Sequence, residues 1–396
     1  MNMILLKATC KNLTNFHQNT VSVDFIAEKK VNNFETEENT VTHLINSIYK
    51  LNTLAFIGIN ASGKTSTMNI LSSIFDIYLG NSSLSQEMKL AKYFSDYVEI
   101  ESFYYEKGTS SIYKICSKIK KDEDKVLYFE DEILYLKKAN TQTNRLNIFD
   151  FEDKHKRIDR TTVNDSFLKR EDSIFSSLMN NSANNPSAII DMCNVTFNYL
   201  SAIDKSMVMS FVRYLDSSID KFEVFENATN KPPKFRIKFK NSNNDIIVDI
   251  LQLDSYLSSG TIKGISFLTY ILNIFKNGGY LLIDEIENHF NKTIVINIIR
   301  MFSSNLNKNS ATLLFSTHYS EILDAIDRSD SIYVLNKKQD IHVNKFSKIA
   351  GSYDRIDKKK SDVILSGILD TAPRYSAYMD LKSALSEKLE GGITND

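Results

Sequence analysis

The chain has 396 residues, of which 24% are charged, and its formal net charge is −1. This balance gives no overall basic field that would attract nucleic acid, although a basic patch could still form locally. The longest apolar region, residues 262–286, is interrupted by charged side chains, so we expect no membrane span. The three cysteines (Cys10, Cys116 and Cys193) are scattered, which excludes a disulfide framework and predicts a cytoplasmic location.

The first part of the chain reads mainly as strands. Three short apolar runs predict strands over residues 5–10, 21–25 and 54–57. The charged stretch 28–39 lies between them and is expected to be a loop. Apolar positions with helical spacing then continue to about Leu79. Alternating runs within residues 97–138, joined by polar turns, predict antiparallel strands.

A glycine-containing loop joins the strand ending at Ile57 to the following helix. Gly58, four further residues and Gly63-Lys64-Thr65 give the full pattern of a phosphate-binding loop. Its glycines allow successive N–H groups to face one anion, and the helix adds its positive end. Lys64 is expected to reach the β- and γ-phosphates, and Thr65 to bind Mg²⁺. The alternative is a strand-to-helix turn that binds nothing. The predicted ATP-binding residues are Gly58, Asn60, Ala61, Ser62, Gly63, Lys64, Thr65 and Ser66.

The middle of the chain, from about residue 140 to residue 220, is polar with helical spacing. Its charge run, residues 152–160, is typical of a solvated helix face, with direct contact to nucleic acid as the alternative. Strands are expected over 234–240 and 245–251, and helices alternate with strands from 258 to 336, which predicts a parallel sheet. The predicted parts are an N-terminal ATPase lobe (1–139), a helical insertion (140–220), a C-terminal ATPase lobe (221–350) and a helical tail (351–396).

Two further strands end in polar residues that suit the same site. The apolar run 279–283 is followed by Asp284, expected to bind Mg²⁺, and by Glu285, expected to polarise the attacking water. A surface acidic cluster is the alternative for this pair. The next strand ends at His318, which the crossover helix should place on the same sheet edge, where it can contact the γ-phosphate or hold the water. A lone histidine after a strand is otherwise usually structural.

The turn Leu257-Ser-Ser-Gly-Thr261 precedes another predicted helix. Ser258, Ser259 and Gly260 at a helix start form a second anion site. One chain does not need two γ-phosphate sites. A head-to-tail pair does, because each nucleotide then lies between the phosphate loop of one subunit and this turn of the other. The expected assembly is therefore a homodimer or a higher homo-oligomer.

These elements, in this order, resemble the ABC-type ATPase head of the SMC, RecF and OLD group. The phosphate loop from Gly58, the turn at Ser258, the run Asp284-Glu-Ile-Glu-Asn288 and the run Ser316-Thr-His318 carry the resemblance. It implies an α/β head with a mixed sheet core, an antiparallel β subdomain and an inserted α-helical subdomain. It also implies ATP and Mg²⁺ as ligands, with Glu285 and His318 as catalytic residues. The group's Q-loop glutamine is not identified in this sequence.

The run Lys11-Asn-Leu-Thr-Asn-Phe16 and the tail with Gly367 and Pro373 further resemble the stand-alone ATPases of bacterial phage-defence operons. OLD-type members carry a C-terminal Toprim nuclease, and this chain has no room for one after Val334. The resemblance therefore implies a sensor or regulatory ATPase with a separately encoded effector, expected to be a nuclease. The alternatives are a RecF-like ATPase that clamps DNA and, with less support from the Ser-Ser-Gly-Thr turn, the nucleotide-binding subunit of a transporter.

Overall fold

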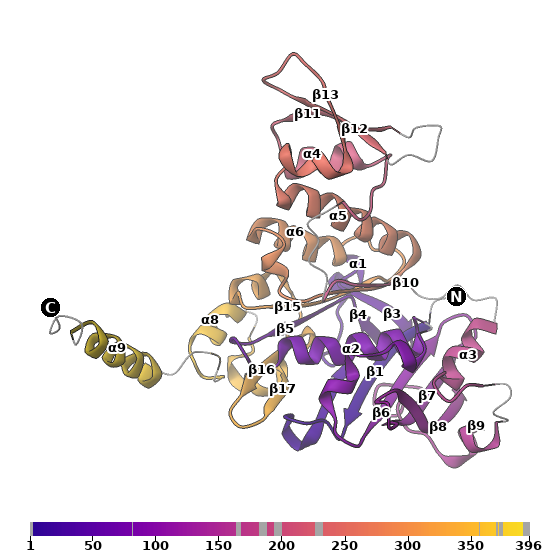
Figure 1. The fold of residues 1–396 in the computed structure, drawn as a ribbon. Helices are drawn as coiled ribbons and strands as arrows, with labels where there is room; N and C mark the ends of the chain where they lie inside the picture. Colours follow the sequence, from indigo (N-terminus) through magenta and orange to yellow (C-terminus); the bar gives the residue numbers. More distant parts are fainter. Residues whose placement is uncertain are drawn as a thin grey trace.

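The computed structural model describes residues 3–80, 82–163, 168–181, 188–193, 200–225, 233–355, 357–369, 371 and 375–390. Within these ranges the chain is a mixed α/β protein with two six-stranded sheets, one three-stranded sheet and one two-stranded sheet (Figure 1). Within these residues no helix has the length and apolar character needed to cross a membrane.

The core sheet is mostly parallel. Its strands lie in the order β10 (Ala188–Asp191), β14 (Gly279–Ile283), β15 (Thr312–Thr317), β5 (Thr53–Ile57), β16 (Ile332–Lys337) and β17 (Ile341–Lys345). The first five run parallel to their neighbours, and β17 is antiparallel to β16. Because parallel strands end at the same edge of a sheet, the residues that follow β5, β14 and β15 come together there.

Both faces of the core sheet are buried, which explains why its strands are continuous apolar runs. In β5, Leu54 and Phe56 pack in one hydrophobic cluster together with helix α2 (Lys64–Tyr78). The alternate side chains, Ala55 and Ile57, belong to a second cluster. That cluster contains apolar residues of α5 (Ser259–Asn277) and α6 (Lys292–Phe302), which cover the other face of the sheet (Figure 1).

The second large sheet is antiparallel. Its order is β2 (Thr20–Asp24), β1 (Met3–Lys11), β6 (Tyr97–Glu106), β7 (Ser111–Lys121), β8 (Leu127–Lys138) and β9 (Lys156–Asp159). Its inner side chains share a cluster with α2 and the core sheet, so α2 lies between the two sheets.

Strand β8 continues through Glu132, whose side chain is fully buried. The carboxylate has partners in this buried position, because Arg160 pairs with it at 3.2 Å and Ser173 donates to it at 2.6 Å. Burial raises the pKa of Glu132 to about 7.

The segment predicted as helical differs from the expectation. Helices α3 (Ile174–Asn181) and α4 (Val208–Leu215) occur there, but β9 and β10 are strands. The prediction of a helix face over residues 152–160 was wrong: a 3-10 turn, Asp153–His155, leads into β9. The backbone of β9 pairs with β8, and this tertiary pairing overrides the local charge pattern.

Several other elements were not expected. They are α1 (Asn33–Glu37), β3 (Val41–Ile45), β4 (Ile48–Leu51) and β11 (Ile219–Phe225). β11 forms a small sheet with β12 (Lys234–Phe239) and β13 (Ile246–Asp249), and this sheet packs on α4 and the first half of α5. The C-terminal part contains α7 (Phe346–Ile349), α8 (Lys360–Leu365) and α9 (Tyr375–Glu390), and α9 extends away from the body (Figure 1). Pro373, part of the predicted tail motif, lies outside the described residues.

Strand β4 carries a buried lysine. Lys50 is only 1% exposed, and its ammonium donates to Thr312 Oγ1 at 2.6 Å and to the backbone oxygen of Ser310. Within the described residues no carboxylate pairs with it. Burial without a counter-charge lowers the pKa of Lys50 to about 7.

This shift predicts a pH dependence of stability. The folded-state pKa of Lys50 lies below its unfolded value, so the unfolded chain binds more protons above pH 7, and the unfolding free energy should rise with pH. From pH 7 to pH 10, wild type should gain up to about 4 kcal/mol relative to Lys50→Met, at roughly 1.4 kcal/mol per pH unit. Denaturant titrations of both chains test this. Parallel pH profiles would contradict the assignment of a low pKa to Lys50.

Candidate functional site

The phosphate loop follows β5 and leads into α2 with little free space around its glycines. Gly63 has φ of +96°, and a Cβ there would lie 2.5 Å from Ile341 Cγ2. At Gly58 a Cβ would lie 2.3 Å from the backbone oxygen of Leu335. Gly63 therefore requires glycine both for its left-handed backbone and for the close approach of β17. Gly58 requires glycine for the close approach of β16.

The loop presents unused hydrogen-bond donors. Ser62 N–H bonds to Ile59 O at 3.2 Å, whereas the N–H groups of the other residues from Asn60 to Ser66 have no acceptor in the described part of the chain. The Ser62 hydroxyl is likewise buried without a partner. Unsatisfied donors at the start of a 15-residue helix create a site of positive potential. This arrangement fits the phosphate groups of a nucleotide.

Lys64 is held over this loop. Its side chain is only 4% exposed, and its ammonium donates to Gly58 O at 2.9 Å and to Ile59 O at 3.2 Å. The same nitrogen lies 3.2 Å from His318 Nδ1. Burial lowers the pKa of Lys64, and the nearby carboxylates of Glu285, Asp284 and Glu287 act in the opposite direction.

The predicted magnesium ligands lie side by side. Thr65 Oγ1 donates to Asp284 Oδ2 at 2.5 Å, and Ser316 Oγ donates to the other carboxylate oxygen. Among the described residues no group of three or more His, Cys, Asp and Glu could hold a metal alone. A hydroxyl and one carboxylate nevertheless fit Mg²⁺, which usually takes its remaining ligands from phosphate and water.

Glu285 and His318 face each other at the same sheet edge. Glu285 has φ of +48° and ψ of +62°, an unusual conformation for a residue with a side chain, and its N–H donates to Ser316 Oγ at 2.7 Å. Its Oε1 lies 3.2 Å from His318 Nε2, and its Oε2 accepts from Asn288 at 2.5 Å. Since the ammonium of Lys64 can only donate, His318 accepts at Nδ1 and turns its Nε2 proton to Glu285.

Two supporting residues were not assigned roles from sequence. Ser316 bonds both Asp284 and Glu285 N–H, and Glu287 accepts from His318 N–H at 2.5 Å. The parallel register pairs Ile283 with Phe315, so the residues that follow each of them are neighbours across the strands. Once that pairing is known, the position of Ser316 follows from it.

Strand β10 also reaches this edge. Asp191, its last residue, accepts from Ser72 Oγ and from Lys89 Nζ, each at 2.5 Å. Burial and the negative charges of Asp191 and Asp284 raise the pKa of Cys193 well above its usual value. Residues 194–199, which follow, lie outside the described ranges. Sequence reasoning missed β10 because four residues are too short to establish a periodicity.

The turn at Ser258 lies apart from this constellation. Ser258 caps α5, and its Oγ accepts from Thr261 N–H at 3.1 Å. Within the described residues no hydrogen bond or ion pair connects Ser258, Ser259 or Gly260 to Lys64, Asp284, Glu285 or His318. The turn therefore makes no direct bond to the phosphate-loop site of its own chain.

Comparisons with known proteins identify no family. No family model matches the sequence, and no curated protein matches it. Among solved structures, the chain is similar to the SMC head domain from Thermotoga maritima, with 13% identity and a TM-score of 0.39. The match covers 86% of this chain and 98% of that chain. At this identity and TM-score the similarity assigns neither family nor activity.

Proposed function

We propose that this protein is an ABC-type ATPase that binds ATP with Mg²⁺ and hydrolyses it to ADP and phosphate. One observation carries the proposal: Lys64, the Thr65–Asp284 pair and the Glu285–His318 pair converge at the carboxyl ends of β5, β14 and β15. Thr65 and Asp284 are 219 residues apart in the chain but in direct contact. A phosphate loop, a hydroxyl–carboxylate pair and a carboxylate–histidine pair at one edge suit phosphoryl transfer to water.

Each side chain has a distinct role in this proposal. Lys64 and the free N–H groups of the loop bind the phosphates and neutralise their charge. Thr65 and Asp284 would hold Mg²⁺, which would neutralise further phosphate charge when bound. Glu285 accepts the proton of the attacking water, while His318 fixes the orientation of the Glu285 carboxylate. The unusual backbone of Glu285 is consistent with a position set by function rather than by local preference.

The Ser258 turn serves the site of a second copy in this proposal. Within the described residues it makes no bond to the loop of its own chain, and its exposed helix start can bind a γ-phosphate. Ser258→Arg is expected to keep ATP binding to the monomer while hydrolysis fails. Mixing this variant with Lys64→Ala should restore some hydrolysis, because a head-to-tail pair can carry both defects in one composite site. Phosphate release measured across mixing ratios tests this.

A second variant separates function from folding at this turn. A Cβ at Gly260 would meet only Ser258 Oγ, at 3.7 Å, so Gly260→Ala should fold normally, and it should keep ATP binding while hydrolysis fails. If a mixture stays as inactive as either parent, Ser258→Arg is titrated into wild type. Inhibition beyond dilution would indicate shared sites that must both act, whereas simple dilution would contradict sharing.

At a finer level, we propose a regulatory role in anti-phage defence with a separately encoded effector. The support is the sequence resemblance at residues 11–16 and in the tail. We expect a nuclease gene next to this one. Its product should co-purify with the Glu285→Gln chain in the presence of ATP. ATP-dependent binding to DNA without any such partner would favour the RecF-like alternative.

A further inference from the structure

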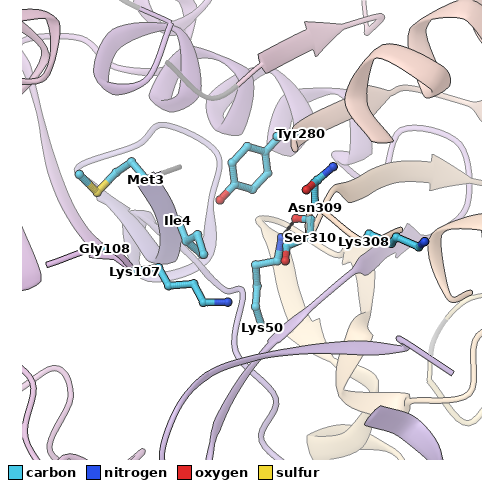
Figure 2. A pocket seen from close by; sticks show the side chains of 10 residues that line it. Met3, Ile4, Lys50, Lys107, Gly108, Tyr280, Lys308, Asn309 and Ser310 are labelled. Carbon is cyan, nitrogen blue, oxygen red and sulfur yellow. Dashed lines mark hydrogen bonds between the residues drawn. The ribbon is translucent and has the colours of Figure 1, made fainter. Parts of the chain in front are cut away.

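A cavity of about 340 Å³ lies at the opposite edge of the core sheet from the phosphate loop. Gly279 and Tyr280 at the start of β14 line one side, and the loop before β15 lines another. Figure 2 shows Tyr280 and, from that loop, Ser310. The complete lining is Met3, Ile4, Lys50, Lys107, Gly108, Gly279, Tyr280, Lys308, Asn309 and Ser310. Since β14 has five residues and a strand rises about 3.3 Å per residue, this cavity lies roughly 16 Å from Asp284.

The lining is cationic and contains no acid. Lys50 lies at the buried end of the cavity, and Lys107 extends its ammonium toward the same space, whereas Lys308 at the rim points outward (Figure 2). Neither the Lys107 nor the Lys308 ammonium has an ion pair or hydrogen bond within the described residues. A buried ammonium without a counter-ion is unfavourable in free energy. A negatively charged ligand could supply the counter-charge that Lys50 lacks.

The hydroxyl of Tyr280 also favours an anion. The hydroxyl of Tyr280, whose side chain is 2% exposed, accepts from Leu5 N–H at 2.8 Å. Its own proton has no acceptor in the described part of the chain. Lys50 uses two of its three protons on Ser310 and Thr312, which leaves the third. Tyr280 and Lys50 therefore each keep one proton that a ligand oxygen could accept.

We propose that this cavity binds a phosphate-bearing small molecule. A phosphate group carries more than one negative charge and several acceptor oxygens, so it can bind Lys50, Lys107 and Tyr280 together, whereas a single carboxylate would neutralise only one lysine. The volume lies within the range of small-molecule sites. The concave shape and the buried Lys50 favour a compact ligand over an extended nucleic-acid strand. Binding here should not compete with ATP, because the two sites lie at opposite ends of β14.

The test uses pyrophosphate as the probe and the full-length Lys64→Ala chain, in which the phosphate loop is disabled. Calorimetric titration at low salt should show one pyrophosphate per chain. Lys107→Glu and Lys50→Met, each added to that background, should weaken binding on the order of tenfold to a hundredfold, because each removes a charged donor. Lys107 is exposed, so its replacement should not impair folding.

Lys125→Glu is the matched control. Lys107 and Lys125 both lie in hairpin turns of the antiparallel sheet, and both replacements change the net charge equally. Binding should survive Lys125→Glu. The proposal is overturned if pyrophosphate does not bind, or if the control weakens binding as much as Lys107→Glu does. A single-stranded oligonucleotide that binds through Lys107 when pyrophosphate does not would make nucleic-acid phosphate the ligand and also overturn it.

Discussion

Glu285→Gln is expected to slow ATP hydrolysis by a factor of about a hundred to ten thousand while ATP still binds. The amide cannot take the proton of the attacking water, but it keeps the size of the carboxylate and one oxygen that can accept from His318 or Asn288. Lys64, Thr65 and Asp284 are unchanged, so capture of the nucleotide should persist. Single-turnover phosphate release and equilibrium ATP binding measure the two properties separately. We also expect this variant to accumulate as an ATP-bound dimer.

Glu321→Gln is the control for this experiment. Glu321 is an exposed carboxylate in the 3-10 segment that follows His318, and it makes no hydrogen bond within the described residues. Its replacement should leave hydrolysis at the wild-type rate. If Glu285→Gln also hydrolyses ATP at the wild-type rate, the general base lies elsewhere, and His318 becomes the next candidate.

The parts of the site that sequence could predict are local. Strand β5, the loop and α2 are consecutive, and their glycines, lysine and apolar spacing can be read without knowing the fold. Asp284 and His318 each end an apolar run, so the rule that ligands collect at the carboxyl edge of a parallel sheet places them together. The β17 strand that closes on Gly63 could not be predicted, because its contact joins residues far apart in the chain.

The parts that sequence could not predict depend on register between distant strands. Ser316 becomes a ligand of Asp284 only because β14 and β15 pair in one register. Lys50 illustrates the same limit. A lysine in a short strand is expected to face solvent. Here it is buried because Ser310 and Thr312, about 260 residues later, provide its hydrogen-bond acceptors.

Lys64→Ala is expected to abolish hydrolysis and to weaken ATP binding on the order of a hundredfold, because the only lysine within the phosphate loop is lost. The folded chain should keep its stability, since burial disfavours this ammonium and its hydrogen bonds go to loop carbonyls. Lys292→Ala is the matched control, because Lys292 is also the first residue of its helix, α6, but is exposed. Fluorescent-nucleotide binding and thermal melting distinguish loss of the site from loss of the fold.

A Lys64→Ala chain that melts as wild type does but neither binds nor hydrolyses ATP would support the loop as the nucleotide site. Turnover near the wild-type value would refute the ATPase assignment, because the remaining N–H donors alone cannot neutralise the charge that develops on the transferred phosphate.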